Sequence, residues 1–338
     1  MIVEEKSKKE VALTGIKPTG TPHIGNYLGA IKPALKLAEH YNARYFIADY
    51  HALNVIRNPQ ELKDNVYEVA ATWLACGLDP DKVILYKQSS VPETFELATM
   101  LMAFTAKGLM NRAHSYKANV AENEAKGKDP DFAVNMGLYT YPVLMAADIL
   151  LFDTDVVPVG KDQKQHIEMA VDIAHVFNHN YKCECIRIPH PIIGEDIKTI
   201  VGLDGRKMSK TYNNTIPMFA SSKKLRKTIM KIVTNSQAIE EPKVPDECNV
   251  FSLYKLFASK NQQKSLKERY QNGGMGWGEA KQELFEVMEK IIAPKRLIYE
   301  DLMNDKQKID VILKSGAEKA RSIASAKIRA LRKTIGID

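Results

Sequence analysis

The stretch "LTGIKPTGTPHIGNYLGAIKP", residues 13–33, decides the fold. It begins inside the apolar segment "VALTG" at residues 11–15, whose terminal glycine predicts a buried strand that runs into a turn. The segment "YLGAIKPALKLAEHY" at residues 27–41 then places apolar side chains at close to helical spacing. We therefore expect a strand, a loop rich in glycine and proline, and a helix, in that order.

The same alternation continues along the chain. The segment "ARYFIADYHAL" at residues 43–53 predicts a second strand, which ends in Asp49 and His51. A helix is expected from Pro59 to just before Gly77, and a third strand over "KVILYKQS" at residues 82–89. Alternating strands and helices predict an α/β fold with a doubly wound parallel sheet, in which ligands bind beyond the carboxyl ends of the strands.

In the second half of the chain the alternation of strands and helices gives way to helices alone. The segment "DVVPVG" at residues 155–160 predicts another strand end, and Asp162 is available as the N-cap of the helix that follows. Beyond residue 217 the pattern is helical without clear strands. We therefore expect an α/β domain over residues 10–218 and a smaller all-α domain over residues 219–314. A basic helix over about residues 315–338 is expected to pack back on the first domain.

The composition fits an ordinary globular protein and excludes some function classes. No apolar run approaches the ~18 residues needed to cross a bilayer. The first residues, "MIVEEKSKKEVAL", carry mixed charges and lack the apolar core of a secretion signal. We therefore expect a cytoplasmic protein with no membrane partner. The net charge of +7 permits a polyanionic partner without requiring one.

The cysteines do not show the spacing of a metal site. Zinc and iron–sulfur sites favour two Cys-x-x-Cys pairs, and this sequence has only a Cys-Glu-Cys. We therefore expect reduced and mostly buried thiols at four positions: Cys76, Cys183, Cys185 and Cys248.

The loop "GIKPTGTPHIGN" at residues 15–26 suits a phosphate ligand. Its glycines let backbone N–H groups approach a ligand closely, and the helix that follows directs its partial positive charge to the same place. His23 would present its imidazole there as a donor. The loop lacks both the Gly-Lys-Ser/Thr of a P-loop and the Gly-x-Gly-x-x-Gly of a dinucleotide site. A tight strand-to-helix connection with a surface histidine remains the alternative.

A second loop, "GLDGRKMSKTYNNTIP" at residues 202–217, carries Lys207 and Lys210 on either side of Met208 and Ser209. A mobile loop with two lysines can bring cations to a departing polyphosphate. The alternative is a solvated basic loop.

The two loops together resemble those of a known family. "HIGN" at residues 23–26 resembles the His-Ile-Gly-His motif of class I aminoacyl-tRNA synthetases, and "KMSKT" at residues 207–211 resembles their Lys-Met-Ser-Lys-Ser motif. "GIKPTGTPHIGNYLGAI", "YPVLMAADIL" and "VPVGKDQKQHIE" resemble the tryptophanyl-tRNA synthetase family in its compact bacterial form. The likeness runs over residues 11–336.

The resemblance implies a fold, a reaction and partners. The first domain would be a Rossmann-like catalytic domain, and residues 219–314 an anticodon-binding domain. L-Tryptophan and ATP, with Mg²⁺ carried by the ATP, would give tryptophanyl adenylate and pyrophosphate, and the tryptophan would then pass to tRNA(Trp). The resemblance also implies a homodimer, with no prosthetic group and no dedicated metal site.

The resemblance further assigns roles to residues of this sequence. Gly25 would leave room for adenine, and Asp162 would accept from the ribose hydroxyls. The catalytic residues would be His23, Asn26, Lys207, Ser209 and Lys210. The ATP contacts would be Lys17, Thr19, Gly25, Asn26, Gly160, Asp162, Lys207, Met208 and Lys210. The tryptophan contacts would be Leu13, Gly15, Asp49, His51, Tyr141, Met145, Asp148, Val157, Val159 and Gln163.

Asp148 would select the substrate. An indole N–H only donates, so one buried acceptor is enough, whereas a phenol O–H both donates and accepts. The alternative is a helix carboxylate paired with a lysine or arginine. The apolar Met145 suits an indole better than a phenol, which favours tryptophan over the rival family, tyrosyl-tRNA synthetase. Two further classes stay open: a nucleotidyltransferase of the same superfamily, and a catalytically silent paralogue that binds RNA or nucleotide.

Three positions depart from the family pattern. Lys17 stands where Gln is common, Asn26 stands in place of the second histidine of the class motif, and Thr211-Tyr212 stands in place of Ser-Asp. The role of Lys17 stays open, and the hydroxyl of Thr211 is expected to preserve the loop chemistry.

Overall fold

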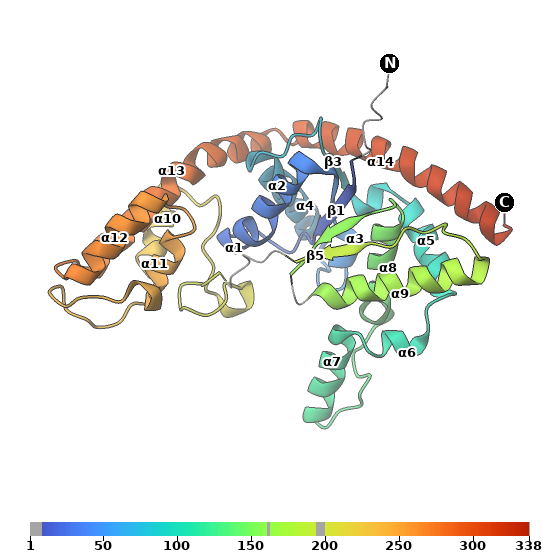
Figure 1. Ribbon diagram of the computed structural model, residues 1–338, viewed down its shortest axis with the longest axis horizontal. Coiled ribbons are helices and arrows are strands. Elements are labelled where there is room, and N and C mark those ends of the chain that lie inside the picture. Colours follow the sequence, from blue (N-terminus) through green and yellow to red (C-terminus); the bar gives the residue numbers. More distant parts are fainter. Residues whose placement is uncertain (1–8, 161–162, 194–199, 338) are drawn as a thin grey trace, which may run out of the picture.

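A five-stranded parallel sheet forms the centre of the molecule. The structure is a computed structural model and describes residues 9–160, 163–193 and 200–337 (Figure 1). The strands lie in the order β3-β2-β1-β4-β5, and every pairing is parallel. The expected doubly wound α/β fold is therefore confirmed. The strands are β1 (Val11–Ile16), β2 (Asn42–Ile47), β3 (Ile84–Lys87), β4 (Val156–Pro158) and β5 (His190–Ile192).

The helices surround this sheet and extend to one side of it (Figure 1). No helix in the described part of the chain is long and apolar enough to cross a membrane. Up to residue 181 the helices and turns are α1 (Ile24–Asn26), the π-helical η1 (Tyr27–Ile31), α2 (Lys32–His40), α3 (Asp49–Ala52), α4 (Pro59–Ala75), η2 (Gln88–Ser90), α5 (Glu93–Met102), α6 (Lys107–Met110), α7 (His114–Ala125), α8 (Met136–Leu150) and α9 (Lys164–Tyr181). The later ones are η4 (Lys210–Tyr212), α10 (Ser222–Ile229), η5 (Pro245–Glu247), α11 (Asn249–Tyr254), α12 (Lys260–Asn272), α13 (Trp277–Asn304) and α14 (Lys306–Ile335).

The second strand is shorter than its apolar sequence suggests. Pairing of β1 with β2 ends where Ile16 lies opposite Ile47, because β1 itself ends there. The expectation that this strand continues to residue 53 is therefore wrong. Asp49 and His51 lie on the short helix α3, which places their side chains beyond the carboxyl edge of the sheet.

The helix after the first loop is interrupted by a π-helical turn. Pro33 has no N–H to donate to the carbonyl of Gly29, four residues earlier, so the regular α pattern cannot run through this point. The wider hydrogen-bonding pattern of the π-helical turn η1 accommodates this missing bond before α2 begins at Lys32.

Two apolar clusters hold the fold together. One contains Trp73 of α4 and continues through Leu225, Phe251 and Leu284 of the later helices. This apolar cluster therefore runs from the sheet region into the helices beyond residue 218. The other cluster joins α8, α9 and the second half of α14.

The last helix covers the edge strand β3. It begins at Lys306, earlier than the sequence pattern suggests. A Cβ atom on Gly316 would lie 1.8 Å from the carbonyl oxygen of Leu85, so only a glycine allows this approach. Arg321 pairs with Glu93 of α5 at 3.2 Å, which ties the helix to the sheet region.

The expectation of four reduced thiols is right for two of the cysteines and wrong for the other two. Cys76 and Cys248 are free and buried, as expected. Cys183 and Cys185, in the loop after α9, instead form a disulfide. Their Cα atoms lie 5.3 Å apart, within the range that a disulfide bridges.

We predict that Gly316→Ala destabilises the protein by about 3 kcal/mol, because the added methyl must push α14 away from β3. The change would be measured as a lower urea midpoint of unfolding. Gly278→Ala is the matched control, since nothing lies within 4 Å of its added Cβ. Equal midpoints for the two variants would contradict the close contact at Gly316.

Candidate functional site

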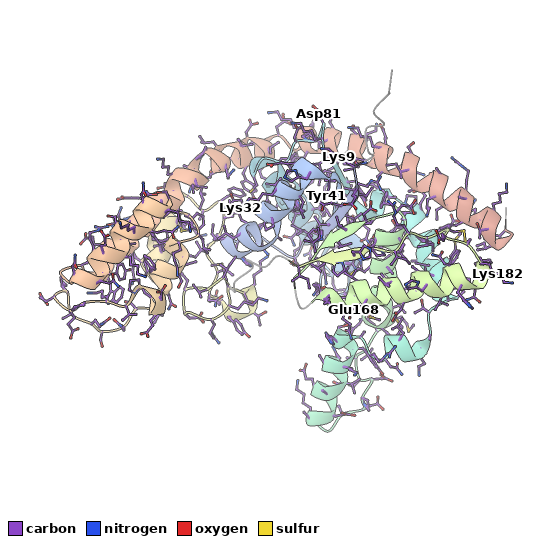
Figure 2. All side chains as sticks on the ribbon, viewed as in Figure 1. Lys9, Lys32, Tyr41, Asp81, Glu168 and Lys182 are labelled. Atoms are coloured by element: carbon purple, nitrogen blue, oxygen red, sulfur yellow. A yellow bond between two sulfur atoms is a disulfide. The ribbon has the colours of Figure 1, made fainter. Side chains whose placement is uncertain are left out.

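A cavity of about 830 Å³ opens beyond the carboxyl ends of β1 and β4. Its walls come from these strands and from α2, α3 and α8, and they include Lys32 at the start of α2, which is labelled in Figure 2. Gly29 of the π-helical turn also lines it. This cavity therefore lies where parallel sheets of this kind bind ligands.

Nearly all the expected tryptophan contacts line this cavity. They are Leu13, Gly15, His51, Tyr141, Met145, Asp148, Val157, Val159 and Gln163. Asp49 is the exception among them. Its carboxylate accepts from the backbone N–H of Ser89 at 2.9 Å and from the Ser89 hydroxyl, and it lies at a separate cavity of about 340 Å³.

Asp148 is buried under the cavity with partners that are neither lysine nor arginine. Its Oδ2 lies 2.9 Å from His51 Nε2, and the Gln88 amide donates to both carboxylate oxygens at 2.9 Å. Burial raises the pKa of Asp148, while the hydrogen bonds from His51 and Gln88 act in the opposite direction. The lysine or arginine pairing considered from sequence is therefore not what holds this carboxylate.

Tyr141 and Lys17 form the wall next to Asp148. The Tyr141 hydroxyl lies 2.7 Å from His166 Nε2, which fixes the ring. The Lys17 ammonium lies 6.0 Å from the centre of the same ring. Burial lowers the pKa of Lys17. Lys17, the first departure from the family pattern, therefore brings a cation to the mouth of the cavity.

The two loops noted in the sequence meet at the end of β1. The N–H of Ile24 donates to the carbonyl of Ile216 at 2.9 Å. The Lys210 ammonium donates to the Thr19 carbonyl at 2.6 Å, and the Gly25 N–H lies 3.3 Å from the sulfur of Met208. Residues 202–217 therefore lie against the loop that contains His23.

His23 is neutral near pH 7 in this setting. Burial and the nearby Lys210 ammonium lower its pKa to about 4. Its Nδ1 is buried and has no hydrogen-bond partner within the described ranges. A hydrogen bond from this nitrogen to a phosphate oxygen would satisfy it, which fits a phosphate-bearing substrate.

The absence of a side chain at Gly25 lets His23 and Met208 pack close to its backbone. An added Cβ would lie 2.9 Å from the His23 ring and 3.4 Å from the Met208 sulfur. His23 and Met208 therefore pack close to Gly25, whose place beside adenine stays a prediction, while Gly15, Gly29 and Gly160 line the large cavity.

The expected ATP residues fall into three groups. Lys17 and Gly160 line the large cavity. A small adjoining cavity of about 30 Å³ is lined by residues that include Lys17, Thr19, Asn26 and Lys210. Neither cavity is lined by Gly25, Lys207 or Met208, or by the catalytic candidate Ser209. Asp162, as a ribose contact and as an N-cap, lies outside the described residues.

Two organising residues were missed from sequence, Gln88 and Asn214. Asn214 is buried, and its amide donates to Asp204 Oδ1 at 2.7 Å and to the Lys207 carbonyl at 3.1 Å. It also accepts from the N–H of Ser209 at 2.8 Å. For Gln88, a polar residue directly after a buried strand was the available signal.

The described residues hold no group of three or more metal-ligating side chains.

We predict that Asn214→Ala loosens residues 206–210, because it removes three of the hydrogen bonds that hold this loop. Trypsin cleavage after Arg206, Lys207 or Lys210 should become roughly tenfold faster, while the melting temperature of the whole protein changes little. Asn180→Ala, which removes a bond within α9, is the control. Unchanged cleavage of the loop would show that Asn214 does not restrain it.

Comparisons with known proteins agree with this geometry. The sequence profile of the family described as "tRNA synthetases class I (W and Y)" matches residues 5–293. A tryptophan–tRNA ligase of Bordetella parapertussis is 49% identical over 96% of this chain and 72% of its own length. One from Neisseria meningitidis is 47% identical over 98% of each chain. The tryptophanyl-tRNA synthetase of Campylobacter jejuni, solved with ADP and tryptophan, superposes with a TM-score of 0.87 at 44% identity, over 96% of this chain and 99% of its own. The chain therefore belongs to the tryptophanyl-tRNA synthetase family of class I tRNA synthetases.

Proposed function

We propose that the protein is a tryptophan–tRNA ligase. In the first step the carboxylate of L-tryptophan attacks the α-phosphorus of ATP, the bond to the bridging oxygen breaks, and pyrophosphate leaves. In the second step the tryptophanyl group passes from the adenylate to the 3′ end of tRNA(Trp), and AMP leaves. The observation that carries the proposal is a buried acceptor, Asp148, in a large cavity that shares Lys17 with the small cavity lined by Lys210.

Tryptophan would bind in the inner part of the cavity. Leu13, Met145 and Val157 offer apolar walls to the indole. Asp148 offers an acceptor for the only polar atom of the ring, the indole N–H, which is a donor. Leaving that buried acceptor unsatisfied costs about 1–3 kcal/mol, so an amino acid without a matching donor is disfavoured.

ATP would bind at the outer part, where the two loops meet. Lys210 and Lys17 bring positive charge to the place where pyrophosphate develops negative charge, and neutral His23 offers a hydrogen bond without adding charge. We assign Asn26, Ser209 and Lys207 to the same role from the family resemblance. Mg²⁺ would arrive with the ATP phosphates and keep several of its waters.

tRNA would add a second, larger contact surface. We assign anticodon binding to residues 219–314, where α10 exposes Lys223, Lys224, Arg226 and Lys227. Such a basic face can neutralise phosphates and would make binding depend on salt. We also propose a homodimer and a cytoplasmic location, both from the family resemblance.

We predict that the pure protein with Mg²⁺ catalyses exchange of pyrophosphate into ATP only when tryptophan is present. The assay would be run with each amino acid separately, because the reverse of adenylate formation reports the first step alone. Exchange with tyrosine in place of tryptophan would indicate that the protein is a tyrosyl-tRNA synthetase. Absence of exchange with every amino acid would favour a nucleotidyltransferase or a silent paralogue.

We predict that Lys210→Ala lowers the rate of adenylate formation by roughly 10²-fold or more, since it removes a cation from the departing pyrophosphate. Tryptophan binding should change little, because Lys210 does not line the large cavity. Single-turnover rates and equilibrium dialysis with labelled tryptophan would separate the two effects. Lys82→Ala, on an exposed turn, is the control. Equal losses in rate and binding would argue against a role in the transition state.

A further inference from the structure

We infer that Gln88 is a positioning residue for tryptophan: it holds the Asp148 carboxylate so that one acceptor position faces the indole. This inference rests on the proposed function. Gln88 is fully buried in η2, directly after β3, and does not line the cavity. It therefore acts on the substrate only through Asp148.

The orientation of the Gln88 amide is fixed by the backbone. Its Oε1 accepts from the N–H of Tyr50 at 3.2 Å, so the amide oxygen must face Tyr50. The NH₂ group then faces Asp148, where it lies 2.9 Å from each carboxylate oxygen. The opposite orientation would bring two donors together at Tyr50 and two acceptors together at Asp148.

The hydrogen bonds leave the two oxygens of Asp148 in different states. Oδ2 lies within hydrogen-bond distance of both His51 and Gln88, which uses its two acceptor positions. Among the residues that the structure describes, Oδ1 accepts from Gln88 alone. One acceptor position on Oδ1 is therefore left for the single N–H of an indole, and a phenol O–H would find no donor for its own oxygen at this carboxylate.

The charges around Asp148 make this arrangement sensitive to substitution. The carboxylate faces His51 and the neutral Gln88, and the Asp49 carboxylate is near enough to raise its pKa. Buried Tyr86 is also close, and its own pKa is raised well above the usual value by burial and by Asp148. Replacing the Gln88 amide by a carboxyl group would therefore place two buried carboxyl groups side by side.

Two substitutions test the inference. Gln88→Met removes the donor while keeping similar volume, and we expect the KM for tryptophan in pyrophosphate exchange to rise roughly tenfold or more, with the KM for ATP nearly unchanged. Gln88→Glu keeps the shape, and we expect its tryptophan KM to be near that of the parent at about pH 6 and to rise steeply toward about pH 9. The reason is that a proton shared with Asp148 at low pH replaces the amide N–H and is lost at high pH.

The matched control is Gln60→Glu. Gln60 donates to the Asp64 carboxylate at 3.0 Å in the same way, but on the exposed surface of α4, so its tryptophan KM should follow the parent at every pH. Melting temperatures of all variants would be recorded alongside.

The outcomes separate the inference from the proposed function. If the parent protein shows no tryptophan-dependent exchange, the proposed function fails first. If the parent is active, a Gln88→Glu variant whose tryptophan KM runs parallel to the parent's across pH overturns the inference. So does a Gln88→Met variant that loses stability but keeps the parent KM for tryptophan, or one that raises the KM for ATP equally. Should Gln88→Met fail to fold, the Gln88→Glu profile decides alone.

Discussion

The contact between residues 202–217 and the loop after β1 is the interaction on which the outer half of the site depends. It joins Thr19 to Lys210, which are 191 residues apart in the chain, and it is closed partly by a backbone hydrogen bond from Ile24 to Ile216. Because the contact buries His23 beside an ammonium group, the imidazole stays neutral near pH 7. The positive charge of the pair therefore sits on Lys210, and a phosphate bound there, as we propose, would meet this cation and one neutral hydrogen-bonding group.

The inner half of the site depends on how a carboxylate can stay buried. A lysine beside Asp148 would satisfy the charge, but it would also occupy the acceptor positions that recognition needs. His51 and Gln88 supply hydrogen bonds and leave part of Oδ1 free. The cost of burying the charge is thus only partly offset by the protein, and under the proposed function a donor from the ligand would complete the set of hydrogen bonds.

The sequence predicted the sheet and the cavity better than the inner partners of the site. Short apolar runs that alternate with segments of helical periodicity indicate which segments are buried. These patterns located β1, β3 and β4. Periodicity does not report which neighbour fills the space beside a residue. The resemblance assigned Gly25 to adenine and Asp49 to the substrate without showing that His23 and Met208 pack close to Gly25 or that the Ser89 N–H donates to Asp49. Gln88 was passed over because its partners come from residues 50 and 148 and meet only in the fold.

The C-terminal helix α14 lies beyond residue 293, where the match to the family profile ends, yet it contributes to the position of Gln88. Helix α14 lies against β3, with Gly316 in contact with the backbone of Leu85. On its other side β3 is held by β2, from Arg44 opposite Ile84 to Ile47 opposite Lys87. Gln88 follows Lys87 directly, so the position of its amide is set by a strand clamped between β2 and α14. The carboxylate that faces the cavity is therefore held in place, through Gln88 and β3, by a helix that does not line the cavity.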